Sequence, residues 1–99
     1  MDKAKFEKKY PSLYYLLSCY FHEDWELDAP DIDGVIRLFK KEDQKQVKKT
    51  IRDVKSFMKD VPENEYEKRF NEIYARIYPP GTGMTYKEFL LNIINILEK

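Results

Sequence analysis

The chain has 99 residues, which is enough for one domain but leaves no room for a second hydrophobic core. Eight Tyr, six Phe and one Trp argue against a disordered chain, because disordered chains are poor in aromatic residues. A formal net charge of zero gives no overall attraction to nucleic acid or to a membrane, and the single cysteine, Cys19, excludes an internal disulfide.

Three helices are predicted in the first sixty residues, because apolar residues recur there at intervals of three and four. The first runs from Leu13 to Phe21, and Pro11 suits its first turn, where the missing N–H costs nothing. The second runs from Ile32 to Phe39 after the start signal Asp28-Ala29-Pro30. The third covers the stripe from Val47 to Met58.

Two more helices are predicted in the last forty residues. Pro62 begins a fourth helix, whose apolar stripe is Tyr66, Phe70, Ile73 and Ile77. The segment Pro79–Gly83 is a rigid turn, and Thr85-Tyr86-Lys87-Glu88 has the pattern of a capping box that starts a fifth helix, reaching Leu97. No segment shows sustained strand alternation. We therefore expect an all-α fold, a compact single-domain bundle of about five helices over residues 1–99.

The zero net charge conceals a partition along the chain. Residues 1–36 hold four Lys and eight Asp or Glu, a net charge of −4, whereas residues 37–59 hold nine Lys or Arg and three Asp or Glu, a net charge of +6. Six carboxylates fall within eleven residues that contain no Lys or Arg: Glu23, Asp24, Glu26, Asp28, Asp31 and Asp33.

This crowding favours a surface that is complementary to a basic partner, because like charges repel and cost stability unless something compensates. The alternative is that helix N-termini favour Asp and Glu and that loops are polar. Trp25 lies inside the cluster and fits either a binding hot spot or a core anchor.

The predicted third helix carries a basic stripe opposite its apolar side. Its members are Lys45, Lys48, Lys49, Arg52, Lys55 and Lys59. Such stripes can bind phosphates, but this one lacks interleaved aromatic residues and Asp53 interrupts the segment. We favour a solvated helix face.

Catalytic and metal-binding patterns are weak. His22 is the only histidine, and Cys19 lies in an amphipathic helix, where it is expected to be a small packing residue. The run Asp24-x-Glu26-x-Asp28 resembles the start of a calcium loop, but Ala29 and Val35 stand where that loop needs Gly and Glu. We expect no enzyme, no metal and no cofactor.

No apolar run approaches the roughly 20 residues of a membrane span, and the charged segment 1–9 is not followed by a signal-like apolar region. With its lone cysteine, the chain is expected to be a cytoplasmic protein.

Two blocks of sequence carry a family resemblance. The first is Tyr10-Pro11-Ser12-Leu13, then Leu16 and Leu17, leading into Tyr20-Phe21-His22-Glu23-Asp24-Trp25. The second is Tyr78-Pro79-Pro80, then Thr85-Tyr86-Lys87 and Phe89-Leu90. Together they resemble the immunity proteins of bacterial contact-dependent growth inhibition systems, helical antidotes to a toxin domain delivered by a neighbouring cell. Residues 37–70 carry no such signature.

The resemblance implies tight one-to-one binding of the C-terminal toxin domain of an inhibition effector, without catalysis. Many such toxins are nucleases with basic substrate grooves, so it implies that the acidic residues Glu23 to Asp33 lie at the toxin contact. A block shared by antidotes of different toxins is more plausibly scaffold, which is the role we assign to Tyr20, Phe21, His22 and Trp25. His22 would cap the first helix with Asp24 holding its ring, and Trp25 would pack under the loop.

Two alternatives belong to other classes. One is a small helical adaptor for an unrelated partner. The other is a nucleic-acid-binding regulator that uses the basic third helix, which the acidic remainder of the chain makes less favourable.

Overall fold

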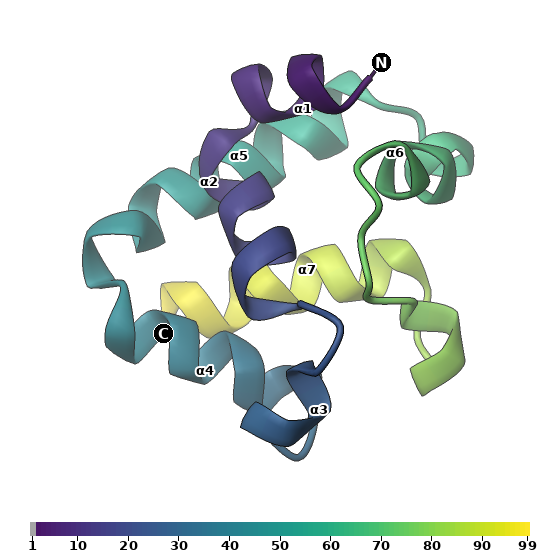
Figure 1. Cartoon of the computed structure of the whole chain (residues 1–99). Helices are drawn as coiled ribbons and strands as arrows, with labels where there is room; N and C mark the ends of the chain where they lie inside the picture. The colour runs from purple at the N-terminus through teal and green to yellow at the C-terminus, as the bar shows by residue number, and fades with distance from the viewer. Residues whose placement is uncertain (1) are drawn as a thin grey trace.

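Helices make up most of this computed structural model, which describes residues 2–99 and has no strand within them (Figure 1). The predicted all-α class is confirmed. The number of helices is larger than expected, with seven α-helices and three shorter helical turns in the described residues. The two additional α-helices are Lys3–Lys9, which precedes Pro11, and the short Trp25–Asp28 among the acidic residues.

The N-terminal part contains α1 (Lys3–Lys9), α2 (Pro11–Tyr15) and the π-helical turn η1 (Leu16–Tyr20). Helix α1 was missed by the sequence prediction. It begins where the Asp2 carboxylate accepts a hydrogen bond from the Lys5 N–H at 2.9 Å. Its last residue is Lys9, because Tyr10 precedes Pro11 and the residue before a proline disfavours the helical conformation. Helix α2 continues into η1, so the helix predicted over Leu13–Phe21 runs from Pro11 to Tyr20.

The central part contains α3 (Trp25–Asp28), α4 (Ile32–Glu42) and α5 (Gln44–Asp60). The start signal predicted at Asp28-Ala29-Pro30 is displaced, because Asp31 caps α4 by accepting a hydrogen bond from the Gly34 N–H at 2.7 Å.

The C-terminal part contains the 3₁₀ turn η2 (Glu63–Glu65), α6 (Tyr66–Glu72), the 3₁₀ turn η3 (Pro79–Thr82) and α7 (Tyr86–Glu98). The predicted capping box at Thr85 and Glu88 is confirmed, with both reciprocal hydrogen bonds present.

The fourth helix was predicted to reach Ile77, and this is wrong. Helix α6 ends at Glu72 because Tyr74 has a left-handed backbone, with φ of 57°. The Ala75 N–H donates to the Phe70 carbonyl at 3.1 Å and the Tyr74 N–H to the Asn71 carbonyl at 3.1 Å. These two bonds form a Schellman motif, which satisfies the last carbonyls of the helix. Ile77 is still buried, but it lies in the irregular segment that follows α6.

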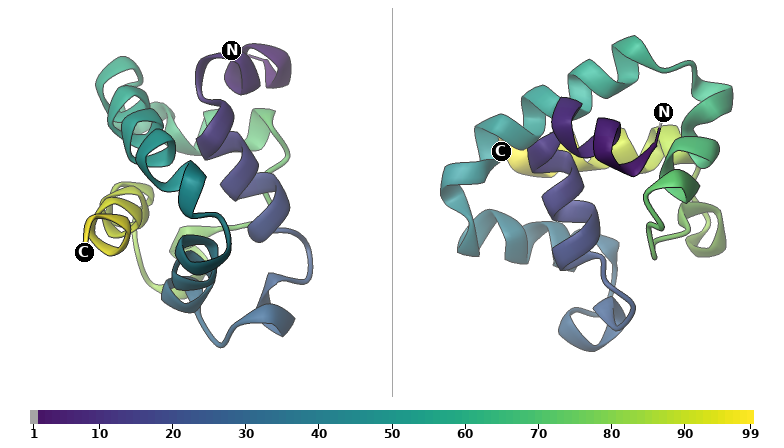
Figure 2. Two further views of the ribbon diagram at one scale, coloured as in Figure 1. Left: turned by 90° about the vertical axis from the view of Figure 1, so that its left-hand side faces the viewer. Right: turned by 45° about the horizontal axis from the view of Figure 1, so that its top comes forward.

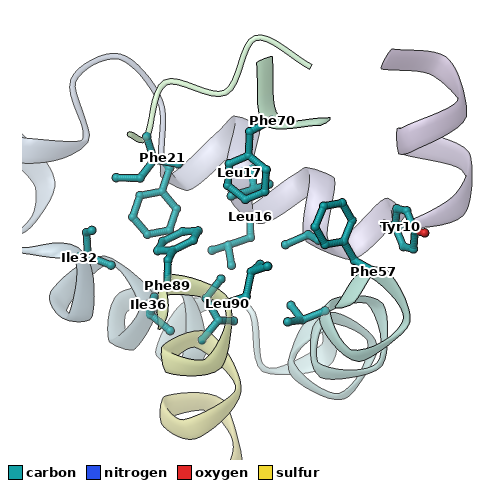
Figure 3. Packing of buried hydrophobic residues seen from close by; sticks show 14 of the residues in the cluster. Tyr10, Leu16, Leu17, Phe21, Ile32, Ile36, Phe57, Phe70, Phe89 and Leu90 are labelled. Atoms are coloured by element: carbon teal, nitrogen blue, oxygen red, sulfur yellow. The ribbon is translucent and has the colours of Figure 1, made fainter. Parts of the chain in front are cut away.

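Helix α7 packs against α4, α5 and α6, and α2 packs against α5. Helix α3 lies at one end of the molecule, away from α1 (Figures 1 and 2). The cluster of buried side chains combines aliphatic residues with nine aromatic ones, several of which are drawn in Figure 3. Neighbouring ring centroids 5.3–6.1 Å apart link Tyr10 to Phe57, then Phe70, Phe89 and Phe21. This series of contacts connects the N-terminal helices to the acidic segment.

The buried face of α5 differs from the predicted stripe. Val47, Ile51 and Met58 are only partly buried, whereas Asp53 and Thr50 are buried. The Asp53 carboxylate accepts hydrogen bonds from the backbone N–H groups of Ser12 at 2.7 Å and Leu13 at 3.2 Å. Asp53 therefore caps α2 from another helix, and the buried face of α5 combines Asp53 and Thr50 with Val54 and Phe57.

Candidate protein-binding surface

The acidic segment, residues 23–33, spans the loop before α3, α3 itself and the start of α4. Glu23, Asp24 and Glu26 are exposed, and their carboxylates make no hydrogen bond or ion pair within residues 2–99. Leu27 is 84% exposed between them and Asp28. The three carboxylates therefore form a surface that is free to meet a partner.

The other three predicted contact residues have partners in the fold. Asp31 caps α4, and the Asp28 carboxylate lies 2.6 Å from His22 Nε2. Asp33 is partly buried, accepts a hydrogen bond from the Asn92 amide and lies 4.0 Å from Arg37. These bonds keep the start of α4 and the end of α3 in place.

His22 is held differently from the prediction. Its Nδ1 accepts a hydrogen bond from the Asp24 backbone N–H at 3.1 Å, so Nε2 carries the proton and donates to Asp28. The prediction that the Asp24 side chain holds the ring is wrong, because that carboxylate points to solvent and Asp28, six residues along, takes its place. The imidazole of His22 thus links the two ends of the segment from His22 to Asp28.

The aromatic residues of the block face inward. Phe21 is fully buried, and Trp25 is 8% exposed with its ring 5.9 Å from that of Phe21 in an edge-to-face arrangement. The Tyr20 hydroxyl donates to Glu42 at 3.1 Å and to Asp43, the residue between α4 and α5. Burial, followed by these hydrogen bonds, raises the pKa of Tyr20. Three aromatic side chains thus fasten the acidic segment to the core.

A groove of about 500 Å³ lies beside the acidic segment. Its lining includes Trp25, Glu26, Asp31 and Asp33, with Thr82 and Met84 from turn η3 and the residues after it. Sequence reasoning missed the contribution of the turn, because it lies about fifty residues away in the chain. A groove with carboxylates and apolar side chains suits the aliphatic stem and cationic head of a Lys or Arg.

The six basic residues of the stripe on α5 are all exposed. Lys55 forms an ion pair with Glu98 at 3.0 Å. Asp53, which interrupts the stripe in the sequence, points to the opposite side of the helix to cap α2.

No group of three or more His, Cys, Asp or Glu side chains in residues 2–99 is arranged to hold a metal ion. Over the same residues, none of the helices has both the length and the apolar character needed to cross a bilayer.

Fold and surface together define a small all-helical protein that presents three unbonded carboxylates beside buried aromatic residues, a form that suits a protein-binding domain. A family model described as CdiI immunity protein matches residues 9–97. The chain belongs to the CdiI immunity protein family, which confirms the resemblance found in its sequence.

A solved structure shares the fold. One chain of the crystal structure of the CdiA-CT/CdiI complex from Y. kristensenii 33638 superposes with a TM-score of 0.80 and 24% sequence identity. The match covers 90% of this chain and 98% of that one. No curated protein has a significantly similar sequence.

Proposed function

We propose that this protein is the antidote to the C-terminal toxin domain of a cognate contact-dependent growth inhibition effector. It binds the toxin one-to-one in the cytoplasm of the producing cell, and the toxin is a nuclease. The observation that carries the proposal is the set of three exposed carboxylates, Glu23, Asp24 and Glu26, that have no partner within residues 2–99. Membership of the CdiI family and the likeness to a chain from a CdiA-CT/CdiI complex support it.

The physical argument starts from the cost of the acidic segment. Clustered like charges lower stability, and a basic partner removes that cost on binding. A nuclease carries positive charge where it holds phosphates, so its substrate groove is the face that an acidic loop fits best. A loop fastened by buried aromatic residues loses little freedom on binding, which favours tight association.

The first experiment is growth rescue. The C-terminal domain encoded by the reading frame immediately upstream is expressed in a sensitive bacterium, with and without this protein. Rescue on co-expression is the expected result. Full toxicity despite confirmed expression of both proteins would contradict the proposal for that pair.

The finer statements need purified components. If the toxin domain is a nuclease, it degrades RNA or DNA in vitro, and titration with this protein ends its activity at an equimolar ratio. Persistent growth inhibition without nucleic-acid cleavage would remove the nuclease assignment while leaving the antidote role intact.

The acidic contact is tested by charge reversal with a matched control. Glu23→Lys with Glu26→Lys is expected to weaken toxin binding at least 100-fold, with most of the change in the association rate at low salt. Glu7→Lys with Glu67→Lys makes the same change in net charge at two exposed glutamates on α1 and α6. If both pairs weaken binding equally, net charge and not this surface determines the affinity.

A further inference from the structure

The segment between α6 and η3 has no regular secondary structure, and its side chains alternate between exposed and buried. Tyr74 and Tyr78 are 74% and 56% exposed and Arg76 is exposed, whereas Ile77 is buried and Ala75 is partly buried. We call Tyr74, Arg76 and Tyr78 the outward row. The backbone N–H groups of residues 76–78 have no acceptor within residues 2–99. The row therefore presents two large aromatic rings and a guanidinium to solvent.

Tyr74 occupies a position that favours glycine. Its φ of 57° lies in the left-handed region, at the C′ site of the Schellman motif that ends α6. A tyrosine is strained there, and its ring makes few contacts that would compensate, since three quarters of it is exposed. A strained conformation kept by an exposed aromatic residue suggests a role outside the fold.

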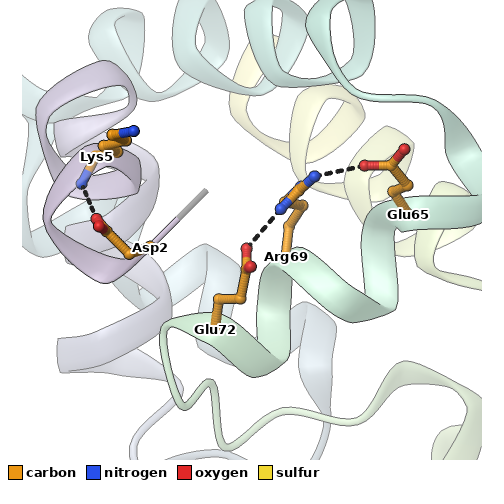
Figure 4. A network of polar contacts seen from close by, with 5 residues as sticks. All are labelled: Asp2, Lys5, Glu65, Arg69 and Glu72. Carbon is orange, nitrogen blue, oxygen red and sulfur yellow. Dashed lines mark hydrogen bonds and ion pairs between the residues drawn. The ribbon is translucent and has the colours of Figure 1, made fainter.

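The outward row follows a helix that is braced by ion pairs. Arg69, in α6, donates hydrogen bonds to Glu65 at 2.6 Å and to Glu72 at 2.8 Å (Figure 4). These bonds, the one to Glu72 first, raise the pKa of Arg69, and the bond from Arg69 lowers the pKa of Glu72. On the other side, buried Ile73 and Ile77 anchor the segment to the core. Buried Ile73 and Ile77 thus position the backbone that carries Tyr74 and Arg76, whose side chains remain exposed.

The row adjoins the acidic segment. A cleft of about 230 Å³ has His22 and Glu23 of the loop and Tyr74 and Arg76 of the row in its lining, together with Lys3 of α1. Glu23 and Arg76 form no ion pair with each other. One surface therefore carries a free carboxylate, a free guanidinium and an exposed aromatic ring side by side.

We propose that the outward row is a second contact for the same toxin domain, an inference that rests on the proposed function. The toxin is the occupant because the row is continuous with the acidic contact surface across this cleft. Tyr and Arg are the residue types that most often dominate binding energy. The complementary toxin face has an apolar recess for the Tyr74 ring and a carboxylate for Arg76, next to the basic groove that meets Glu23. Opposite charges in alternation fix the register of the two proteins.

The two contacts have different kinetic signatures. Exposed charges at Glu23 and Glu26 act at long range and mainly set the association rate, whereas short-range packing of Tyr74 mainly sets the dissociation rate. Tyr74→Asn removes the ring and retains a residue that tolerates the left-handed backbone. The expected result is an unchanged or higher melting temperature together with a dissociation rate at least tenfold faster. Because the fold is not weakened, misfolding does not explain such a loss.

Arg76→Ala is expected to speed dissociation at least fivefold, whereas Arg52→Ala, at an exposed arginine of α5, leaves it within twofold. The probe is the purified C-terminal domain of the upstream-encoded effector, with binding followed by surface plasmon resonance. If Tyr74→Asn and Arg76→Ala dissociate at the wild-type rate while Glu23→Lys with Glu26→Lys still weakens binding, this inference is overturned and the proposed function stands. If the wild-type protein does not bind the toxin domain at all, both fail together.

Discussion

Asp53 offers the sharpest test of how the helices are held together. It is 4% exposed, and its carboxylate accepts two backbone hydrogen bonds at the start of α2, from Ser12 and Leu13. A hydrogen bond to a charged group contributes about 1.5–3 kcal/mol, and its loss leaves a buried N–H without a partner. Asp53→Ala removes both bonds at once, so we expect it to lower the free energy of unfolding by about 3–5 kcal/mol.

Two matched variants are expected to lose less stability than Asp53→Ala. Asp53→Asn retains an acceptor but loses the charge, so we expect a loss of about 1–2 kcal/mol. Asp60→Ala removes an exposed carboxylate of the same helix, which accepts one bond from the Tyr10 hydroxyl at 2.9 Å, and we expect about 0.5–1.5 kcal/mol. Urea denaturation measures all three losses, and in thermal melts Asp53→Ala should lower the melting temperature by about 12–40 °C. A change for Asp53→Ala no larger than that for Asp60→Ala would refute the capping argument.

Three further outcomes follow from the block at residues 20–25. Trp25→Ala lowers the free energy of unfolding by about 3–5 kcal/mol, measured by denaturation, because it empties a buried site against Phe21. The pKa of Tyr20 is raised in the folded protein, so above pH 10 the unfolded chain binds fewer protons than the folded one and stability falls as pH rises. Thermal melts at alkaline pH should show that Tyr20→Phe reduces this fall of stability with pH. His22→Ala lowers stability by no more than about 1 kcal/mol, because the ring is partly exposed, yet it weakens growth rescue by loosening the acidic loop.

The helices that rest on local signals were predictable. Periodicity located α4, α5 and α7, and the capping box gave the start of α7. Helix α1 was missed because its seven residues include only one buried side chain, Phe6, in a charged background. The end of α6 was missed because a tyrosine in the left-handed region has no sequence signature, unlike a glycine.

The candidate surface was predictable as a segment but not residue by residue. The pattern of Asp31 three residues before Gly34 is local, and it indicates a helix cap. The pairing of His22 with Asp28 and of Asp33 with Asn92 depends on tertiary structure, so sequence alone could not separate bonded carboxylates from free ones. The same limit applies to Tyr74 and Arg76, which reach the cleft beside Glu23 only through the fold.

The acidic loop contains residues that hold the fold and residues that face solvent, and substitutions in the two groups have different effects. Phe21 and Trp25 are buried and His22 is bonded within the loop, so substitutions at these positions act on the fold. Glu23 and Glu26 are their chain neighbours and have no bonds within residues 2–99, and changes at such exposed positions usually alter stability by less than about 0.5 kcal/mol. An antidote built in this way can change its outward residues to match a new toxin while its scaffold stays the same. A single loop is thus divided between residues that pack into the core and residues that are free to meet a partner.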